Sequence, residues 1–232
     1  QPILHLASGR IDRYELLLRI VEGDQVFPPE PFIQEAERQG LIWEVDRWVI
    51  SEAARLLRRP TSQASHLAVH IDLHINLSAQ TLFSQRLLDV IREEMQGLPS
   101  WEGRLVLELL ETSPLADLEE ERRRMLELKA LGCRLALDDF GVGYSSCHRL
   151  AHLPLDMVKL DGSLVRGLGS LEAHRVVVAS MVQAAKALGL LVVAEQVEDQ
   201  ETLDALRLLG VDYAQGYHIG KPRPVEEEWP VH

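Results

Sequence analysis

The chain alternates between two spacings of apolar residues along its whole length. Short continuous or alternating apolar runs predict strands, and apolar residues three and four positions apart predict helices. Strands are predicted at residues 3–6, 14–20, 70–77, 104–110, 133–138, 156–160, 190–194 and from 213 onward. Helices are predicted at residues 31–39, 43–58, 81–95, 115–131, 172–188 and 202–209, with an irregular tail beyond 222.

This order of elements predicts an α/β fold. Strands that alternate with helices pair in parallel through helical crossovers. About eight strands in a chain of 232 residues favour a closed TIM (β/α)8 barrel over an open sheet. No helical pattern separates the first two strands, so we expect a hairpin there and a modified barrel with an irregular, antiparallel first strand. No linker or strong repeat interrupts the pattern, and residues 1–232 are predicted to form a single domain.

Polar residues stand where the predicted strands end, which is where ligands gather in such barrels. Glu15, Leu17 and Arg19 share one face of the second strand at a period of two. The later strands end in Asn76, Glu108, Asp138, Asp139, Lys159, Asp161, Glu195 and Gln215. One polar strand end is ordinary, whereas a series directed at the mouth of one barrel predicts a functional site.

Asp138 and Asp139 are adjacent and precede a Gly-x-Gly loop. Two neighbouring carboxylates repel each other unless a cation lies between them, and a divalent metal is the usual cation. The alternative is a strand end in which Asp138 caps the next turn and Asp139 faces water. The other strand ends favour the metal, because six oxygen-bearing side chains suffice for two octahedral ions. These are Glu15, Asn76, Glu108, Asp138, Asp139 and Glu195.

Two such ions, about 3.5–4 Å apart, clamp a phosphoryl group and activate a water molecule for in-line attack. In that arrangement Lys159 orients the water or stabilises developing charge, and Arg19 grips a phosphate oxygen. The pattern therefore indicates metal-dependent hydrolysis of a phosphorylated ligand.

Composition narrows the partners and the compartment. The formal net charge is −12, so we do not expect a nucleic-acid polymer as partner. Cys133 and Cys147 form no CxxC pair and predict reduced thiols in a cytoplasmic protein. For Cys147 a buried structural thiol is favoured over a redox switch. The sequence lacks an apolar run of 18 residues, so no membrane span is expected in this segment. Because the chain begins at Gln1, we expect a piece of a larger protein.

Seven short motifs occur in order along the strand ends. They are Glu15-Leu-Leu-Leu-Arg19, Asn76-Leu-Ser-Ala79, Glu108-Leu-Leu-Glu111, Asp138-Asp-Phe-Gly-Val-Gly-Tyr-Ser-Ser146, Val158-Lys-Leu-Asp161, Val193-Ala-Glu-Gln-Val-Glu198 and Gln215-Gly-Tyr217. Each motif is weak alone, but together they are specific. Over nearly its whole length the chain resembles the EAL domain, a bacterial family of cyclic di-GMP phosphodiesterases.

The resemblance implies a modified TIM barrel that linearises cyclic di-GMP to 5′-pGpG with two Mg²⁺ or Mn²⁺ ions. The six oxygen donors named above would be the metal ligands. Glu195 would also be a candidate general base, Lys159 would hold the attacking water, and Glu111 would brace the loop after Asp139. Ca²⁺ is expected to inhibit, because its larger size and looser coordination misplace the clamp.

The resemblance also implies a substrate site, a homodimer and regulatory domains in the parent chain. The residues expected to bind substrate are Gln1, Leu17, Arg19, Asp161, Glu198 and Gln215. As part of a multidomain signalling protein, the domain would respond to a signal received elsewhere.

Five positions depart from the family pattern. Leu16 replaces the Ala of the naming motif, Leu110 replaces a Thr, and Val142 replaces a small or hydroxylated loop residue. Gln196 stands where Gly is frequent and is expected to narrow the site, and His74 stands where a small residue is expected. None of these changes removes a metal ligand.

The intact ligand set favours an enzyme over two rivals. One rival is a receptor that binds cyclic di-GMP without hydrolysing it, and the other is a scaffold that signals only through contacts with a partner. A second metal site built from His70, Asp72, His74 and Asn76 is less favoured than polar filling of the barrel interior, paired within itself.

Overall fold

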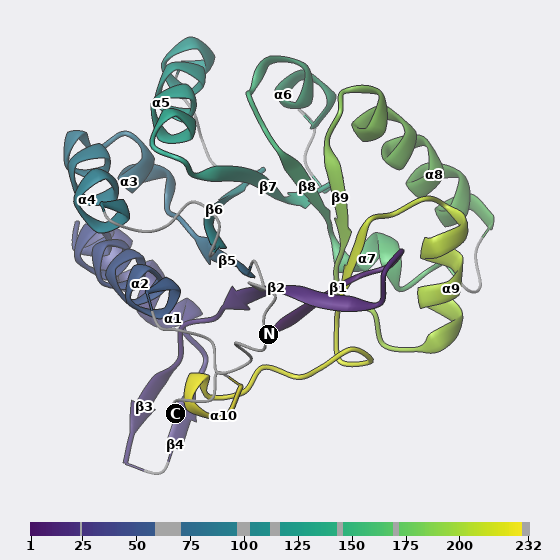
Figure 1. The fold of residues 1–232 in the computed structure, drawn as a ribbon, viewed down its shortest axis with the longest axis horizontal. Helices are drawn as coiled ribbons and strands as arrows, with labels where there is room; N and C mark the ends of the chain where they lie inside the picture. The colour runs from purple at the N-terminus through teal and green to yellow at the C-terminus, as the bar shows by residue number, and fades with distance from the viewer. Residues whose placement is uncertain are drawn as a thin grey trace, which may run out of the picture.

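The computed structural model describes residues 1–23, 25–58, 71–96, 103–111, 117–142, 146–168 and 172–228. Eight of the described strands close into one barrel (Figure 1). Their order around it is β1 (Pro2–His5), β10 (Tyr213–Gln215), β9 (Leu191–Ala194), β8 (Met157–Leu160), β7 (Arg134–Phe140), β6 (Gly103–Leu110), β5 (Ile71–Asn76) and β2 (Arg10–Leu16).

The first strand is the irregular one. β1 is antiparallel to both of its neighbours, with Ile3 opposite Gln215 and Pro2 opposite Tyr14. A tight turn links β1 to β2, and Gly9 in that turn has a positive φ of 66° that glycine adopts without strain. The other neighbouring pairs of the barrel are parallel. The structure thus confirms the predicted modified α/β barrel with an antiparallel first strand.

Helices surround the barrel (Figure 1). They are α1 (Glu30–Arg38), α2 (Ile42–Leu57), α3 (Ala79–Leu82), α4 (Gln85–Met95), α5 (Leu118–Ala130), α6 (Ser146–His152), α7 (Gly162–Val165), α8 (Glu172–Ala187), α9 (Gln200–Leu208) and α10 (Val225–Glu228). In α2 the residues Ile50, Ala53 and Leu57 recur at helical spacing and are buried against the barrel. Capping side chains start several helices: Asp199, for example, accepts a hydrogen bond from the Thr202 amide at 2.7 Å and starts α9.

The strands have an apolar outer face and a layered inner face. Outward residues such as Leu73, Leu107 and Leu135 form the main core with the helices. Inside the barrel, a separate apolar cluster contains Ile3, Val106, Ala136, Met157, Val193 and Tyr213. Two positions further along, the same strands carry Glu108, Asp138, Lys159 and Glu195. Because the side-chain period of a strand is two, these polar groups form the next inward layer, on an apolar floor.

Several predicted boundaries were wrong. The second strand ends at Leu16 rather than at residue 20, because its pairing with β5 ends there. Residues 20–22 and 25–27 instead form a separate antiparallel pair of strands, β3 (Ile20–Glu22) and β4 (Gln25–Phe27). The predicted helix at 81–95 is two helices, because Ser78 and Ser84 each cap a new start. The tail contains the short helix α10.

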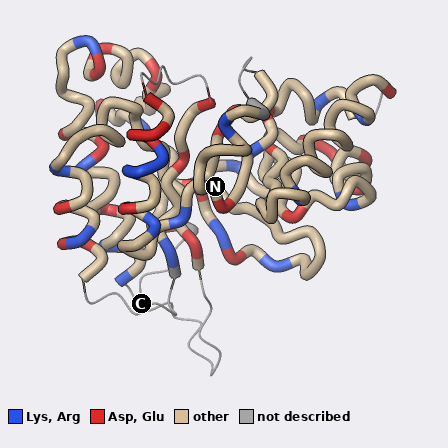
Figure 2. The backbone as a smooth tube through the Cα atoms, turned by 90° about the horizontal axis from the view of Figure 1, so that it is seen from above, with Lys and Arg blue, Asp and Glu red and all other residues tan. Residues whose placement is uncertain are grey.

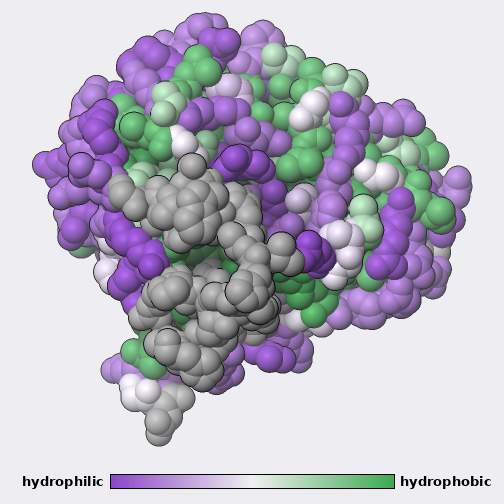
Figure 3. Space-filling model, in the orientation of Figure 1, coloured by the Kyte–Doolittle hydropathy of each residue, from purple (hydrophilic) through white to green (hydrophobic). Residues whose placement is uncertain are grey.

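Charged residues cover the outer helices. Lys and Arg alternate with Asp and Glu along them (Figure 2), as in the pair Arg123–Glu120 at 2.6 Å. Hydrophilic side chains make up much of the visible face, and hydrophobic side chains show between them (Figure 3). In the described part of the chain, no helix combines the length and the apolar character needed to cross a membrane.

Some predictions lie outside the described residues. They concern His70 at the start of the predicted strand 70–77, Tyr144 in the motif that begins at Asp138, and the side chain of Cys147. Cys133 is described and is a buried, free thiol. Burial raises the pKa of that thiol to about 12, which makes it unreactive.

Candidate functional site

Lys159 is the centre of the polar layer and is fully buried on β8. Its ammonium nitrogen lies among four carboxylates that other strands contribute. The distances from Nζ are 2.7 Å to Glu108, 2.7 Å to Glu195, 3.2 Å to Glu15 and 3.4 Å to Asp138. One cation therefore balances part of the negative charge that the strand ends bring together.

Burial and this cation act against each other on the pKa values of the site. Burial alone would lower the pKa of Lys159, but the surrounding carboxylates raise it well above the usual value. Burial raises the pKa of Glu195 to about 7, and Lys159 only partly offsets this effect. Burial also raises the pKa of Glu108. In Glu15, Lys159 and three hydrogen bonds outweigh burial, so its pKa is lowered.

Hydrogen bonds from Asn76 on β5, Lys159 on β8 and Gln215 on β10 fix the Glu15 carboxylate. The amide nitrogen of Asn76 donates to it at 2.9 Å, and the amide nitrogen of Gln215 donates at 2.7 Å. Gln215 also donates to the side-chain oxygen of Gln1 at 3.0 Å, and the Gln1 amino group donates to the Glu15 carbonyl at 2.7 Å. Since Asn76 uses its nitrogen on Glu15, its amide oxygen stays available as a ligand.

Asp138, Asp139 and Glu195 form a cluster of carboxylate oxygens that could hold a metal ion. One carboxylate oxygen of each lies within 4.8 Å of the other two. Asp139 has a φ of 55°, in the left-handed region that non-glycine residues seldom adopt. Burial and the neighbouring Asp138 raise the pKa of Asp139. A divalent cation would relieve this repulsion, and an all-oxygen donor set suits Mg²⁺ or Mn²⁺.

Glu111 lies behind this cluster. It is buried, and its carboxylate accepts a hydrogen bond from the Gly141 amide at 2.9 Å, two residues after Asp139. Arg149 on α6 donates to the Glu111 carbonyl and forms a buried ion pair with Glu121 on α5 at 2.6 Å. The turn that contains Asp139 is thus tied to β6 and, through Arg149, to two helices.

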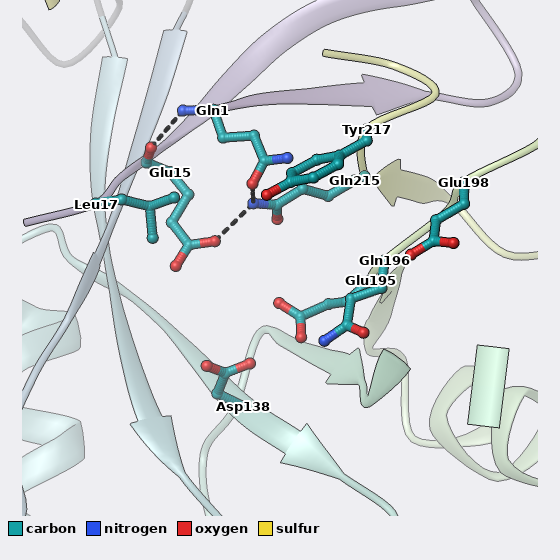
Figure 4. A pocket seen from close by; sticks show the side chains of 10 residues that line it. Gln1, Glu15, Leu17, Asp138, Glu195, Gln196, Glu198, Gln215 and Tyr217 are labelled. Atoms are coloured by element: carbon teal, nitrogen blue, oxygen red, sulfur yellow. Dashed lines mark hydrogen bonds between the residues drawn. The ribbon is translucent and has the colours of Figure 1, made fainter. Parts of the chain in front are cut away.

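A cavity of about 430 Å³ opens beside these carboxylates (Figure 4). Its lining residues are Gln1, Glu15, Leu17, Asp138, Glu195, Gln196, Glu198, Gln215, Gly216 and Tyr217. A side chain at Gly216 would lie 2.2 Å from the Val197 backbone, so the chains that follow β9 and β10 touch without a side chain between them. The Gln215 carbonyl accepts from the Val197 amide at 2.9 Å along this contact.

The structure brings Gln1, Leu17, Glu198 and Gln215 to the cavity but not Arg19 or Asp161. Arg19 follows the end of β2, is exposed, and donates to the Leu18 carbonyl at 2.7 Å. The expectation that it shares a strand face with Glu15 and Leu17 was wrong, because the strand stops at Leu16. Asp161 caps α7 by accepting from the Ser163 amide at 2.9 Å.

Three lining residues, Gln196, Gly216 and Tyr217, were not predicted as catalytic, metal or substrate residues, although Gln196 was expected to narrow the site. Tyr217 stands two positions after Gln215, and Gly216 lies between them. The alternation of strand side chains gives a weak signal for Tyr217. Nothing in the sequence alone signals the contact of Gly216 with Val197, because it depends on how two strands approach each other.

His74 and Asp72 each have polar partners inside the barrel. His74 Nδ1 lies 2.7 Å from Glu108, and burial lowers the pKa of His74 well below its usual value. The pair is therefore a hydrogen bond that involves a neutral imidazole rather than an ion pair. Asp72 lies 2.9 Å from Arg13 and 3.7 Å from Arg134. These contacts match polar filling of the barrel rather than a second metal site.

Comparison with known proteins identifies a family whose members resemble this chain. The EAL domain family matches residues 1–222. The cyclic di-GMP phosphodiesterase PdeF of Escherichia coli (strain K12) is 33% identical over 213 residues, which are 91% of this chain and 28% of that protein. The cyclic di-GMP phosphodiesterase PdeB of Shewanella oneidensis is 36% identical over 227 residues, which are 97% of this chain and 26% of that protein.

A solved structure agrees with the family match. The PaMucR phosphodiesterase in complex with c-di-GMP superposes with a TM-score of 0.86 and 30% identity, covering 98% of this chain and 92% of that one. The fold and the site thus define a TIM-barrel-like domain with an acidic centre. The chain belongs to the EAL domain family, and it spans between a quarter and a third of the length of the curated relatives above.

Proposed function

We propose that this domain hydrolyses cyclic di-GMP to linear 5′-pGpG in a metal-dependent reaction. The observation that carries the proposal is the meeting of Asp138, Asp139 and Glu195 within 4.8 Å of one another, beside a cavity. The choice of substrate is supported by the similar proteins: PdeF and PdeB are named cyclic di-GMP phosphodiesterases, and PaMucR is a phosphodiesterase in complex with c-di-GMP.

The donor set fits two divalent cations, Mg²⁺ or Mn²⁺. Glu15, Asn76, Glu108, Asp138, Asp139 and Glu195 would hold them, since all six offer oxygen atoms and thiolate and imidazole ligands are absent from this set. When bound, such ions polarise a phosphodiester and lower the pKa of a bound water molecule.

The chain's own residues would perform the proton transfer and the positioning. Glu195 lies at the cavity beside Asp138 and Asp139, where its carboxylate would accept a proton from the attacking water. Lys159 would hold that water and offset developing negative charge. Glu111 would keep Asp139 in place through Gly141.

Substrate would bind in the cavity against Gln1, Leu17, Glu198 and Gln215. Leu17 and Tyr217 offer apolar and aromatic surface for a base. A phosphate contact with Arg19 would require that side chain to leave the Leu18 carbonyl and turn toward the cavity. Asp161 would act from the neighbouring loop, where it caps α7.

The competing proposal is a receptor that binds cyclic di-GMP without turnover. It requires loss or misplacement of a metal ligand. The six candidate donors are present in the sequence, and Glu15, Glu108, Asp138 and Glu195 surround Lys159 within 3.4 Å. Geometry therefore favours the enzyme.

We further propose that the 232 residues are a single catalytic domain of a larger signalling protein. In that setting the domain works as a homodimer in the cytoplasm and responds to regulatory domains of the parent chain. Sedimentation at several concentrations, with and without the dinucleotide, tests the dimer.

The direct test is to incubate the protein with cyclic di-GMP and Mg²⁺ or Mn²⁺ and to follow 5′-pGpG by chromatography. We expect product from the parent protein and none from Glu15→Ala. Glu15→Gln keeps the shape of a buried side chain and serves as a second variant if the first fails to fold. Glu201→Ala, on the exposed face of α9, is the control that should retain activity. Binding without product in either metal would replace the enzyme with the receptor.

A further inference from the structure

Gln196 combines a strained backbone with a position at the cavity. Its φ of 53° lies in the left-handed region, where a side chain costs conformational energy that glycine avoids. Among the described residues, only Gln196 and Asp139 are non-glycine residues with positive φ. Asp139 belongs to the acidic cluster. Backbone strain of this kind clusters at functional sites, so a functional role for the Gln196 side chain would explain why this position is not glycine.

The Gln196 side chain is held between two elements. It follows Glu195 at the end of β9 and crosses to the start of α7. A side chain at Gly162 would lie 2.2 Å from the Gln196 side-chain amide carbon, so the glycine there leaves the space that Gln196 occupies. The Gln196 amide therefore has a defined place at the wall of the cavity.

Arg166 on the turn after α7 fixes which way the amide faces. Its guanidinium donates a hydrogen bond to the Gln196 side-chain oxygen. Arginine has donors only, so the amide oxygen must face Arg166 and the NH₂ group must face elsewhere. In Figure 4 that nitrogen is turned toward the side of the cavity where Asp138 and the Glu195 carboxylate lie.

Many of the polar side chains that line the cavity are hydrogen-bond acceptors, so a side-chain donor such as the Gln196 NH₂ group is useful there. Glu15, Asp138, Glu195 and Glu198 line the cavity with carboxylates, which only accept hydrogen bonds when ionised. A phosphate held over the acidic cluster brings further acceptors to the same place. The Gln196 NH₂ group is a neutral donor beside that position, and it needs no counter-charge to approach a phosphate oxygen.

We infer that Gln196 is a specificity-determining residue whose NH₂ group donates a hydrogen bond to a phosphate oxygen of the bound dinucleotide. Arg166 is the positioning residue that turns the amide toward the ligand. The inference rests on the proposed function for the identity of the ligand. It does not require that hydrolysis follow binding.

The test measures the affinity for cyclic di-GMP by calorimetry in Ca²⁺, where we expect no turnover. Gln196→Ala and Gln196→Gly should each weaken binding by about 3- to 10-fold, the equivalent of one neutral hydrogen bond. Gln196→Gly also removes the backbone strain, so its melting temperature should be equal or higher. A purely structural role predicts no loss of affinity in that variant, and unchanged or tighter binding would overturn the inference.

Two further comparisons separate a phosphate contact from other causes. Replacing one non-bridging phosphate oxygen with sulfur weakens the acceptor, so Gln196→Ala should cost less affinity for at least one of the two phosphorothioate isomers. An equal cost for cyclic di-GMP and both isomers would exclude the phosphate. Arg166→Met should weaken binding in the same direction as Gln196→Ala, but less. The controls are Gln200→Ala and Arg207→Met, both exposed on α9.

The same data distinguish this inference from the proposed function. If the parent protein binds cyclic di-GMP in Ca²⁺ but makes no product in Mg²⁺ or Mn²⁺, hydrolysis is wrong and the Gln196 comparison still holds. If the parent protein does not bind the dinucleotide at all, both are wrong.

Discussion

The ammonium nitrogen of Lys159 lies 2.7 Å from the carboxylate oxygen Oε1 of Glu195. Lys159 is fully buried and Glu195 is mostly buried, and each lies next to further carboxylates. The close approach keeps a positive charge beside the group that we propose as general base. The charge of Lys159 therefore affects the proposed general base Glu195, and substituting each residue separately distinguishes their contributions.

Glu195→Gln should reduce turnover far more than affinity. The change removes a metal ligand and the proposed base, and loss of general-base catalysis alone costs about 10²- to 10⁴-fold. Affinity for cyclic di-GMP, measured in Ca²⁺, should change by less than about threefold because the cavity wall keeps its shape. Steady-state kinetics beside calorimetry checks both. Equal losses in rate and affinity would argue against the assigned role.

Lys159→Met should destabilise the fold by about 3–5 kcal/mol, because it leaves buried carboxylates without their cation. Without the Lys159 charge, Glu195 should keep its proton to a pH above the value of about 7 that it has in the parent, so the loss should be smallest at pH 7 and below and should grow above pH 7. Urea unfolding between pH 6 and pH 9 measures this. Lys186→Met, at a partly exposed ion pair with Asp212, is the control and should cost about 1 kcal/mol or less. Equal losses in the two variants would contradict the central position of Lys159.

Glu111→Ala and Glu111→Gln form a matched pair. Alanine removes the acceptor that the Gly141 amide uses at 2.9 Å, whereas glutamine keeps a side-chain oxygen. We expect turnover to fall by 10-fold or more in the alanine variant, an order-of-magnitude estimate for a misplaced catalytic group. The glutamine variant should retain most of it. If both variants lose activity equally, the charge of Glu111 rather than its hydrogen bond is what matters.

Ca²⁺ should inhibit hydrolysis in the presence of Mg²⁺. It has the same charge but prefers longer bonds and six to eight ligands, so it would occupy the acidic cluster without the required geometry. Titrating Ca²⁺ into an assay at fixed Mg²⁺ should lower the rate progressively while cyclic di-GMP remains bound. Strong activity with Ca²⁺ alone would refute the two-metal account.

Asp46→Asn should change how stability depends on pH. Burial raises the pKa of Asp46 on α2, although hydrogen bonds from Ser78 oppose the effect. The folded state thus binds this proton more tightly than the unfolded state does. Stability of the parent relative to Asp46→Asn should rise as the pH falls through the raised pKa toward 3.8, the ordinary pKa of an aspartate. Each tenfold difference in proton affinity adds about 1.4 kcal/mol. Parallel unfolding curves at both ends of that range would contradict the shift.

The sequence predicted the barrel well because its strands and helices differ in apolar period. It also predicted the acidic centre, since Glu108, Asp138 and Lys159 stand two positions beyond apolar inward residues of the same strands. It placed Arg19 wrongly on a strand face, because β2 ends where its pairing with β5 ends, at Leu16. The end of β2 has no signal in the local sequence.

Contacts between distant segments were also hidden. The sequence placed Lys159 at a strand end but did not show that one ammonium lies among four carboxylates. It indicated that Gln196 narrows the site, yet the bond from Arg166 that orients its amide depends on how α7 lies against the segment after β9. Such relationships arise from tertiary structure and have no periodic signature.

The contact between Gly216 and Val197 has a consequence for ligand fit. Two segments of the cavity wall meet backbone to backbone there, so their separation is set by main-chain geometry. A wall of this kind cannot widen by choosing other rotamers, unlike a wall built from packed side chains. We therefore expect the spacing between the segments that carry Gln215 and Glu195 to stay nearly the same whether the cavity is empty or filled.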